Sequence, residues 1–156
     1  YPLSRHALGE VAVFFFFGII PVNLTYYVST LHWSLECLAS SVIIGLYGAN
    51  VLITNNYRDA VDDASVGKTT IAVKFGRNFA ATLYLMNGIA AFLLMSLTWN
   101  DDESWTIVIR SLFLLIHLIL WNRLIKLEGA KITKILAATS MLMLAYALSY
   151  LAYSFS

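Results

Sequence analysis

Long apolar stretches alternate with short polar connections along the chain. Five stretches are long enough to cross a bilayer as helices, because a spanning helix needs about 20 mostly apolar residues. They cover residues 8–28, 35–54, 79–97, 105–125 and 135–153. The connections are short except for residues 55–78, and no repeat or low-complexity linker divides the chain. The pattern predicts an all-α, polytopic bundle of transmembrane helices that forms one domain over residues 1–156.

Composition favours the same class of protein. Of the 156 residues, 60% are hydrophobic and only 12% are charged, whereas soluble domains are about half apolar and about a quarter charged. The lipid bilayer must therefore solvate much of the surface. The formal net charge of +1 argues against nucleic acid as a partner. The chain begins at Tyr1 without a signal-peptide pattern, which suggests a piece of a longer membrane protein.

The basic residues predict how the helices are oriented. Apart from Arg110, the ten Lys and Arg residues lie before the first predicted span, in residues 55–78, or around the connection after the fourth span. Cytoplasmic loops are enriched in Lys and Arg. We therefore expect a multi-pass protein of the plasma (inner) membrane, with the long connection in the cytoplasm and the C-terminus outside. The acidic run Asp101, Asp102 and Glu103 would then lie in an outer loop.

Some small and polar positions are expected to pack helices together. Ser41, Gly45 and Ala49 recur every four residues on the second predicted span, and this spacing lets two helix backbones approach closely. The sequence leaves open the roles of four other polar residues, namely Asp62, His117, Asn23 and Asn50.

The long connection carries the candidate chemistry. It has no Gly or Pro before Gly67, so we expect the second helix to continue into it. Asn55, Asp59 and Asp63 would then share one helix face. Two carboxylates four residues apart repel each other unless a cation lies between them. Mg²⁺ prefers such oxygen ligands and completes its shell with phosphate and water.

Two basic residues extend this pattern. Lys68 follows the flexible Gly67 and could reach a phosphate, and Arg58 could bind one with bidentate geometry. The alternative interpretation is a solvated cytoplasmic loop whose charges only face water, and the spacing alone does not exclude it.

The same connection resembles a motif of a known family, the UbiA-type membrane prenyltransferases. The matching residues, in order, are Asn55-Asn56-Tyr57-Arg58-Asp59, Asp63 and Gly67-Lys68-Thr69-Thr70. They resemble the second aspartate-rich motif of the family, most closely that of the enzymes that prenylate 1,4-dihydroxy-2-naphthoate in menaquinone synthesis. Leu8-Gly9-Glu10 also looks like part of an earlier helix in these enzymes.

The resemblance implies a fold of nine membrane helices, of which this chain would hold the last five. The first aspartate-rich motif of the family, Asn-Asp-x-x-Asp, is absent from residues 1–156. Half of the metal site would then come from the N-terminal helices of the same enzyme. We accordingly expect the chain to be the C-terminal part of one membrane prenyltransferase domain, incomplete as a catalyst.

The resemblance also implies an activity. It is the Mg²⁺-dependent transfer of a polyprenyl group from a polyprenyl diphosphate to an aromatic acceptor, here dihydroxynaphthoate. By position in the motif, Asp59 and Asp63 would bind the metal, and Arg58 and Lys68 would contact the diphosphate. Four further residues would lie on the substrate side: Asn55, Asn56, Tyr57 and Glu10.

A second function class stays open from the sequence. The chain could be a non-catalytic membrane module or a transporter fragment. A transporter should show paired helices broken by Gly or Pro near the bilayer midplane, and only Pro21 comes near that pattern. The sequence does not set the prenyl chain length, the acceptor or the oligomeric state.

Overall fold

The computed structural model describes residues 6–99 and 104–154, which contain helices and no strand. The acidic run at Asp101, Asp102 and Glu103 lies outside the described residues. In chain order the elements are α1 (Gly9–Val13), the π-helical η2 (Phe14–Ile19), α2 (Ile20–Thr30), α3 (Leu35–Ser65), α4 (Ile71–Phe75), α5 (Arg77–Leu94), the 3₁₀ turn η3 (Met95–Leu97), α6 (Ser104–Leu124), the 3₁₀ turn η4 (Gly129–Ile132) and α7 (Thr133–Ser154). The all-α prediction is confirmed.

Five helices in the described part of the chain are long and apolar enough to cross a membrane, which confirms the five predicted spans. Their bounds are Gly9–Thr30, Leu35–Ser65, Arg77–Leu97, Ser104–Leu124 and Gly129–Ser154. The first combines α1, η2 and α2, and the last combines η4 and α7. The short helix α4 was not predicted, because five residues are too few to show a periodic pattern.

Helix α3 continues into the long connection, as the sequence predicted. Ser34 caps the start of α3, and its side chain accepts a hydrogen bond from the backbone N–H of Cys37 at 3.2 Å. Its 31 residues give a length of about 46 Å, against a hydrocarbon core about 30 Å thick. The chain leaves the helix through Gly67, whose φ of 71° favours glycine. The last turns of α3 therefore extend beyond the bilayer core.

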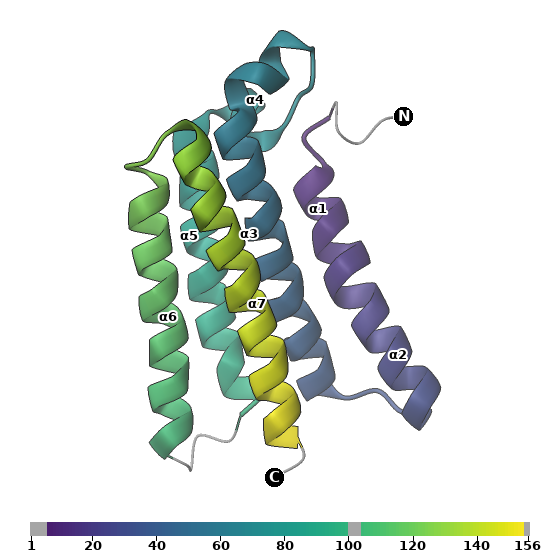
Figure 1. The fold of residues 1–156 in the computed structure, drawn as a ribbon. Coiled ribbons are helices and arrows are strands. Elements are labelled where there is room, and N and C mark those ends of the chain that lie inside the picture. The colour runs from purple at the N-terminus through teal and green to yellow at the C-terminus, as the bar shows by residue number, and fades with distance from the viewer. Residues whose placement is uncertain (1–5, 100–103, 155–156) are drawn as a thin grey trace.

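The spanning helices run side by side, with α3 among them (Figure 1). Helix α3 packs against α5, against α7 and against the first helix along α1, η2 and α2, whereas α6 packs against α5 and α7. One end of the bundle, called the motif end below, holds the start of α1, the end of α3, α4 and the connection from α6 to α7 (Figure 1). The C-terminus lies at the opposite end. The basic connections therefore gather at the motif end.

Two glycines bring the first helix onto α3. A Cβ added at Gly18 would collide with the backbone of Gly45, and one added at Gly45 would lie 2.7 Å from the carbonyl oxygen of Phe14. The two backbones touch at this point, which is the close approach predicted from the small residues of the second span. Asn23 adds a polar link nearby, because its amide donates to the hydroxyl of Ser41 at 2.7 Å.

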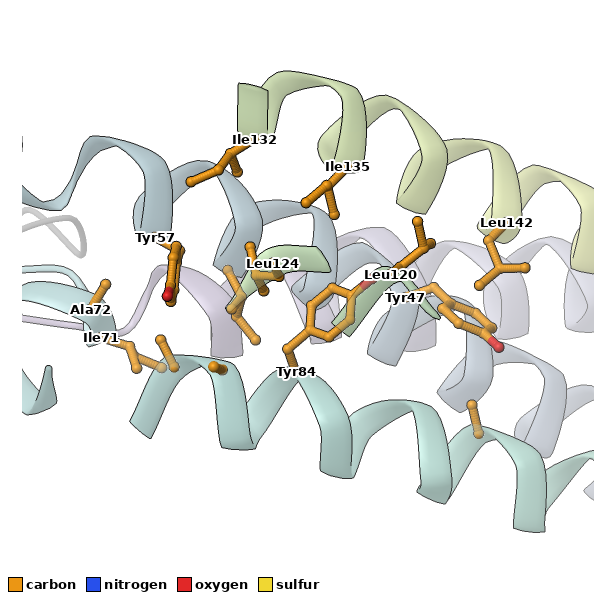
Figure 2. Packing of buried hydrophobic residues seen from close by; sticks show 14 of the residues in the cluster. Tyr47, Tyr57, Ile71, Ala72, Tyr84, Leu120, Leu124, Ile132, Ile135 and Leu142 are labelled. Carbon is orange, nitrogen blue, oxygen red and sulfur yellow. The ribbon is translucent and has the colours of Figure 1, made fainter. Parts of the chain in front are cut away.

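Helices α3 to α7 enclose the hydrophobic core. Figure 2 shows side chains of this cluster from several helices pointing toward one another, among them Tyr47, Tyr84, Leu120 and Leu142. The first helix contributes few buried positions and exposes large apolar side chains such as Phe17, which is 71% exposed. These side chains have no place in water, so lipid or other membrane helices must cover them.

The glycine contact predicts a position-specific loss of stability. Gly45→Ala should lower the free energy of unfolding by about 1–3 kcal/mol, because the added methyl meets backbone atoms that cannot move aside. Gly48→Ala is the matched control on the same helix, since its Cβ would meet only side-chain atoms, of Val13 at 3.3 Å and of Met143 at 4.0 Å. Chemical unfolding in detergent measures both. Equal stability of the two variants would contradict the contact.

Candidate functional site

The final turns of α3 present the two motif aspartates, and Asp59 is paired with its neighbour. Arg58 Nε donates to Asp59 Oδ1 at 2.7 Å, and Arg58 Nη2 donates to Asp59 Oδ2 at 2.8 Å. The same guanidinium reaches Asn55 Oδ1 at 2.9 Å and Thr133 Oγ1, at the start of α7, at 3.2 Å. Arg58 therefore holds Asp59 and connects α3 to α7, and both side chains of the ion pair remain partly exposed.

Asp63, one turn further on, is paired with Lys68. Lys68 Nζ lies 3.1 Å from both carboxylate oxygens of Asp63. The turn at Gly67 reverses the chain and brings Lys68 back over the end of α3, where its backbone N–H also donates to the Asp63 carbonyl at 2.9 Å. Asp63 is only 8% exposed. A nearly buried carboxylate needs a cation beside it, and here Lys68 supplies the charge.

Glu10 enters the same region from the first helix. Its Oε1 accepts a hydrogen bond of 2.8 Å from Asn56 Nδ2, and both residues are nearly buried. Glu10 Oε2 and Asn56 Oδ1 are buried without a hydrogen-bond partner. Both residues line a cavity of about 70 Å³ together with Lys68 and Thr70. The cavity thus combines two unsatisfied oxygen acceptors with the cation that holds Asp63.

Tyr57 lies away from this group. It belongs to the hydrophobic cluster and lies near Ile71 and Ala72 of α4 (Figure 2). The guanidinium of Arg77 stacks over its ring at 5.3 Å from the centroid, and Arg77 Nη2 donates to the Arg58 carbonyl at 3.3 Å. Tyr57 and Arg77 therefore fix the position of the helix turn that carries Arg58.

Deeper in the bundle, polar residues join helices to one another. Asn50 donates to the backbone carbonyl of Tyr84 at 3.1 Å and accepts from Asn87 at 2.9 Å. The Tyr84 hydroxyl is hydrogen-bonded to Thr139 at 2.9 Å. His117 is fully buried, stacks on Tyr84 with ring centroids 4.7 Å apart and fills the space beside Gly88. These contacts place the membrane-embedded Asn50 and His117 in the packing between helices.

The sequence did not predict that Thr133 and Arg77 contact Arg58. Arg58 contacts Thr133 across 75 positions of sequence, so no local pattern could reveal the pair. Asp62, whose role the sequence left open, is exposed on the helix surface.

The arrangement suits a divalent cation and a phosphate. Two carboxylates lie on adjacent turns of one helix and are each held by a basic side chain. The donor set consists of oxygens, which Mg²⁺ prefers, and the two bases match the charge of phosphate. Within residues 6–99 and 104–154, no three His, Cys, Asp or Glu side chains gather as a closed metal site would need.

Comparison with known proteins now places the chain in a family. The family model described as the UbiA prenyltransferase family matches residues 1–144. The chain belongs to the UbiA prenyltransferase family. This family membership, together with the five apolar helices, makes it a multi-pass membrane protein.

Curated relatives of this family member include three proteins with related names. A 1,4-dihydroxy-2-naphthoate octaprenyltransferase of Haemophilus influenzae is 32% identical over 107 residues, which are 67% of this chain and 34% of that protein. A protein of the same name from Mycobacterium tuberculosis is 37% identical over 101 residues, 62% of this chain and 35% of the relative. A 2-carboxy-1,4-naphthoquinone phytyltransferase of Synechocystis is 23% identical over 97 residues, 62% of this chain and 32% of the relative.

The similarity covers only part of each relative. The chain spans about a third of the length of the curated relatives that it matches. No solved structure matches the chain.

The Glu10–Asn56 pair gives a prediction for stability. Asn56→Ala should lower the free energy of unfolding by about 1–3 kcal/mol, because it leaves a buried carboxylate without its donor. Glu10→Gln is the matched control, since it keeps the oxygen that accepts from Asn56 and should cost less. Thermal unfolding in detergent compares the two variants. A larger loss for Glu10→Gln than for Asn56→Ala would show that the hydrogen bond is not the stabilising contact.

Proposed function

We propose that the chain is part of an integral membrane prenyltransferase. The enzyme transfers a polyprenyl group from a polyprenyl diphosphate to an aromatic acceptor, 1,4-dihydroxy-2-naphthoate, in menaquinone biosynthesis. The observation that carries the proposal is the pair of carboxylate–base contacts, Asp59 with Arg58 and Asp63 with Lys68, at the motif end of α3. Such a site attracts metal and diphosphate together while the neighbouring apolar helices accommodate the prenyl chain.

In this proposal Asp59 and Asp63 bind Mg²⁺, which would neutralise the diphosphate and help it leave. Arg58 and Lys68 each neutralise one of these carboxylates. With Mg²⁺ bound at the carboxylates, the same two bases would be available to bind diphosphate oxygens. Arg58 offers a bidentate fork and Lys68 a point charge on a flexible stem.

The other candidate residues orient the substrates or the catalytic side chains. Asn55 holds the Arg58 guanidinium. Glu10 and Asn56 offer unsatisfied oxygens in the cavity beside Lys68, where a donor on a substrate would find an acceptor. Tyr57 acts through Arg77, which stacks on its ring and binds the backbone of Arg58.

The names of the relatives support the identity of the acceptor more strongly than the identity of the prenyl donor. Those from Haemophilus influenzae and Mycobacterium tuberculosis are named for octaprenyl transfer to dihydroxynaphthoate, and that from Synechocystis for phytyl transfer to a carboxynaphthoquinone. A two-ring naphthalene nucleus is common to the three names, whereas the isoprenoid differs. We therefore propose dihydroxynaphthoate as the acceptor and leave the chain length open.

The proposal predicts that the two paired aspartates are essential. In the complete enzyme, Asp59→Asn and Asp63→Asn should each reduce prenyl transfer by about 100-fold or more, since each removes charge that holds the metal and the leaving group. Asp62→Asn is the matched control, because Asp62 is exposed on the same turns and has no basic partner within the described residues. The assay follows prenylated naphthoate in membranes. Near-normal turnover of Asp63→Asn would refute the metal assignment.

We further propose that residues 1–156 form the C-terminal part of the catalytic domain and work with additional N-terminal helices. The relatives are about three times as long as their matched segments. The first helix exposes large apolar side chains such as Phe16 and Phe17, and the region around Glu10 holds unsatisfied oxygens. Additional helices could cover the exposed apolar side chains of the first helix. They could also supply hydrogen-bond donors or metal ligands to the region around Glu10.

This division of the site predicts complementation. Residues 1–156 alone should give no prenyl transfer with Mg²⁺, a polyprenyl diphosphate and dihydroxynaphthoate. Co-expression with the N-terminal helices of the enzyme should restore activity, because separated membrane helices reassociate by packing. Clear turnover by residues 1–156 alone would mean that the site is self-contained.

The basic residues at the motif end support a cytoplasmic location for this end, in the plasma membrane. The prediction is tested with a Cys at Ser65, which is exposed at the end of α3, in a chain in which Cys37 is replaced by Ala. A membrane-impermeant thiol reagent should label it only after the cells are opened. Labelling of intact cells would reverse the proposed orientation.

A further inference from the structure

The connection between α6 and α7 carries a pocket that the paired aspartates do not line. Its volume is about 280 Å³. Three basic residues line it: Arg123 from the last turn of α6, Lys131 from η4 and Lys134 from the first turn of α7. Its apolar wall includes Leu120, Ile135 and Ala138. The pocket therefore has a cationic rim and a hydrocarbon wall.

The charges on this rim are not neutralised by the protein. Within the described residues, no hydrogen bond or ion pair joins the side chain of Arg123, Lys131 or Lys134 to an acid. All three side chains belong to exposed residues. Glu128 lies in the same connection but does not line the pocket. Like charges held around one pocket repel each other, and an anion between them would relieve that repulsion.

The position of the pocket selects the kind of anion. Arg123 and Lys134 lie near the ends of two helices that are long and apolar enough to cross a membrane, where lipid headgroups would meet water. Leu120 and Ala138 lie one turn further along the same helices, toward the bilayer core. A ligand that fills both parts has an anionic head and an apolar tail. Basic pockets between membrane helices on the cytoplasmic side bind anionic headgroups in this way.

We propose that this pocket binds an anionic phospholipid, whose phosphate lies among Arg123, Lys131 and Lys134 and whose acyl chain contacts Leu120 and Ala138. The pocket adjoins the candidate functional site, because Thr133, between two of these basic residues in sequence, accepts a hydrogen bond from Arg58. The lipid would thus hold the connection that supports Arg58. The proposal does not depend on the transfer reaction.

The test uses the protein in nanodiscs of phosphatidylcholine with increasing phosphatidylglycerol, with retained lipid counted by native mass spectrometry. The variant Lys131→Gln/Lys134→Gln should weaken phosphatidylglycerol retention about 25-fold, at about fivefold for each basic residue. The matched control is Lys74→Gln/Lys126→Gln, which removes two exposed charges that do not line the pocket and should leave retention unchanged. Equal losses of phosphatidylglycerol retention in both variants would overturn the proposal. So would a wild-type protein that retains phosphatidylcholine as well as it retains phosphatidylglycerol.

A second pair of variants keeps every charge. Ala138→Trp should fill the apolar wall and reduce retention several-fold, whereas Ala137→Trp, at an exposed neighbour that does not line the pocket, should not. Competition distinguishes a lipid from a free phosphate compound. Inorganic diphosphate should leave the retained lipid in place, because it lacks the apolar part. Displacement by diphosphate, or unchanged retention in Ala138→Trp, would contradict a lipid site.

Discussion

The continuity of α3 is the constraint on which the rest of the structure depends. One helix must cross the bilayer and then extend into water without a break, so its sequence changes from apolar and small residues to acids and amides with no Gly or Pro at the junction. The first helix, α5 and α7 all pack on it. Because a helix is stiff, this packing fixes the direction in which Asp59 and Asp63 emerge at the motif end.

Charge balance at the motif end follows from that geometry. Carboxylates carried to the edge of a bilayer are costly unless a cation accompanies them, and the chain supplies one base to each aspartate through a neighbouring residue and a glycine turn. Each base is held beside its own aspartate, Arg58 with Asp59 and Lys68 with Asp63. The glycine contact between the first helix and α3 brings Glu10 to the same place. Packing inside the membrane thereby sets the composition of the site outside it.

Much of the fold could be predicted from the sequence, because transmembrane helices are recognised by the length and hydropathy of their apolar stretches. The five spans and the extension of α3 are such local properties. Contacts between residues far apart in the sequence could not be predicted, because they leave no local pattern. The hydrogen bond from Arg58 to Thr133 and the pairing of Glu10 with Asn56 depend on how helices cross. Tyr57 shares a motif with the aspartates, yet helical geometry turns its ring toward the core and Arg77.

The most direct measurement of the central claim is metal binding observed by a method other than turnover. Mn²⁺ replaces Mg²⁺, and electron paramagnetic resonance reports the bound ion in purified enzyme with an unreactive polyprenyl diphosphate analogue. We expect one or more bound Mn²⁺ ions in the wild type and in Asp62→Asn, with phosphorus coupling from the analogue. In Asp59→Asn and Asp63→Asn the bound Mn²⁺ should be lost. Unchanged Mn²⁺ binding in both of these variants would contradict the assignment of the site.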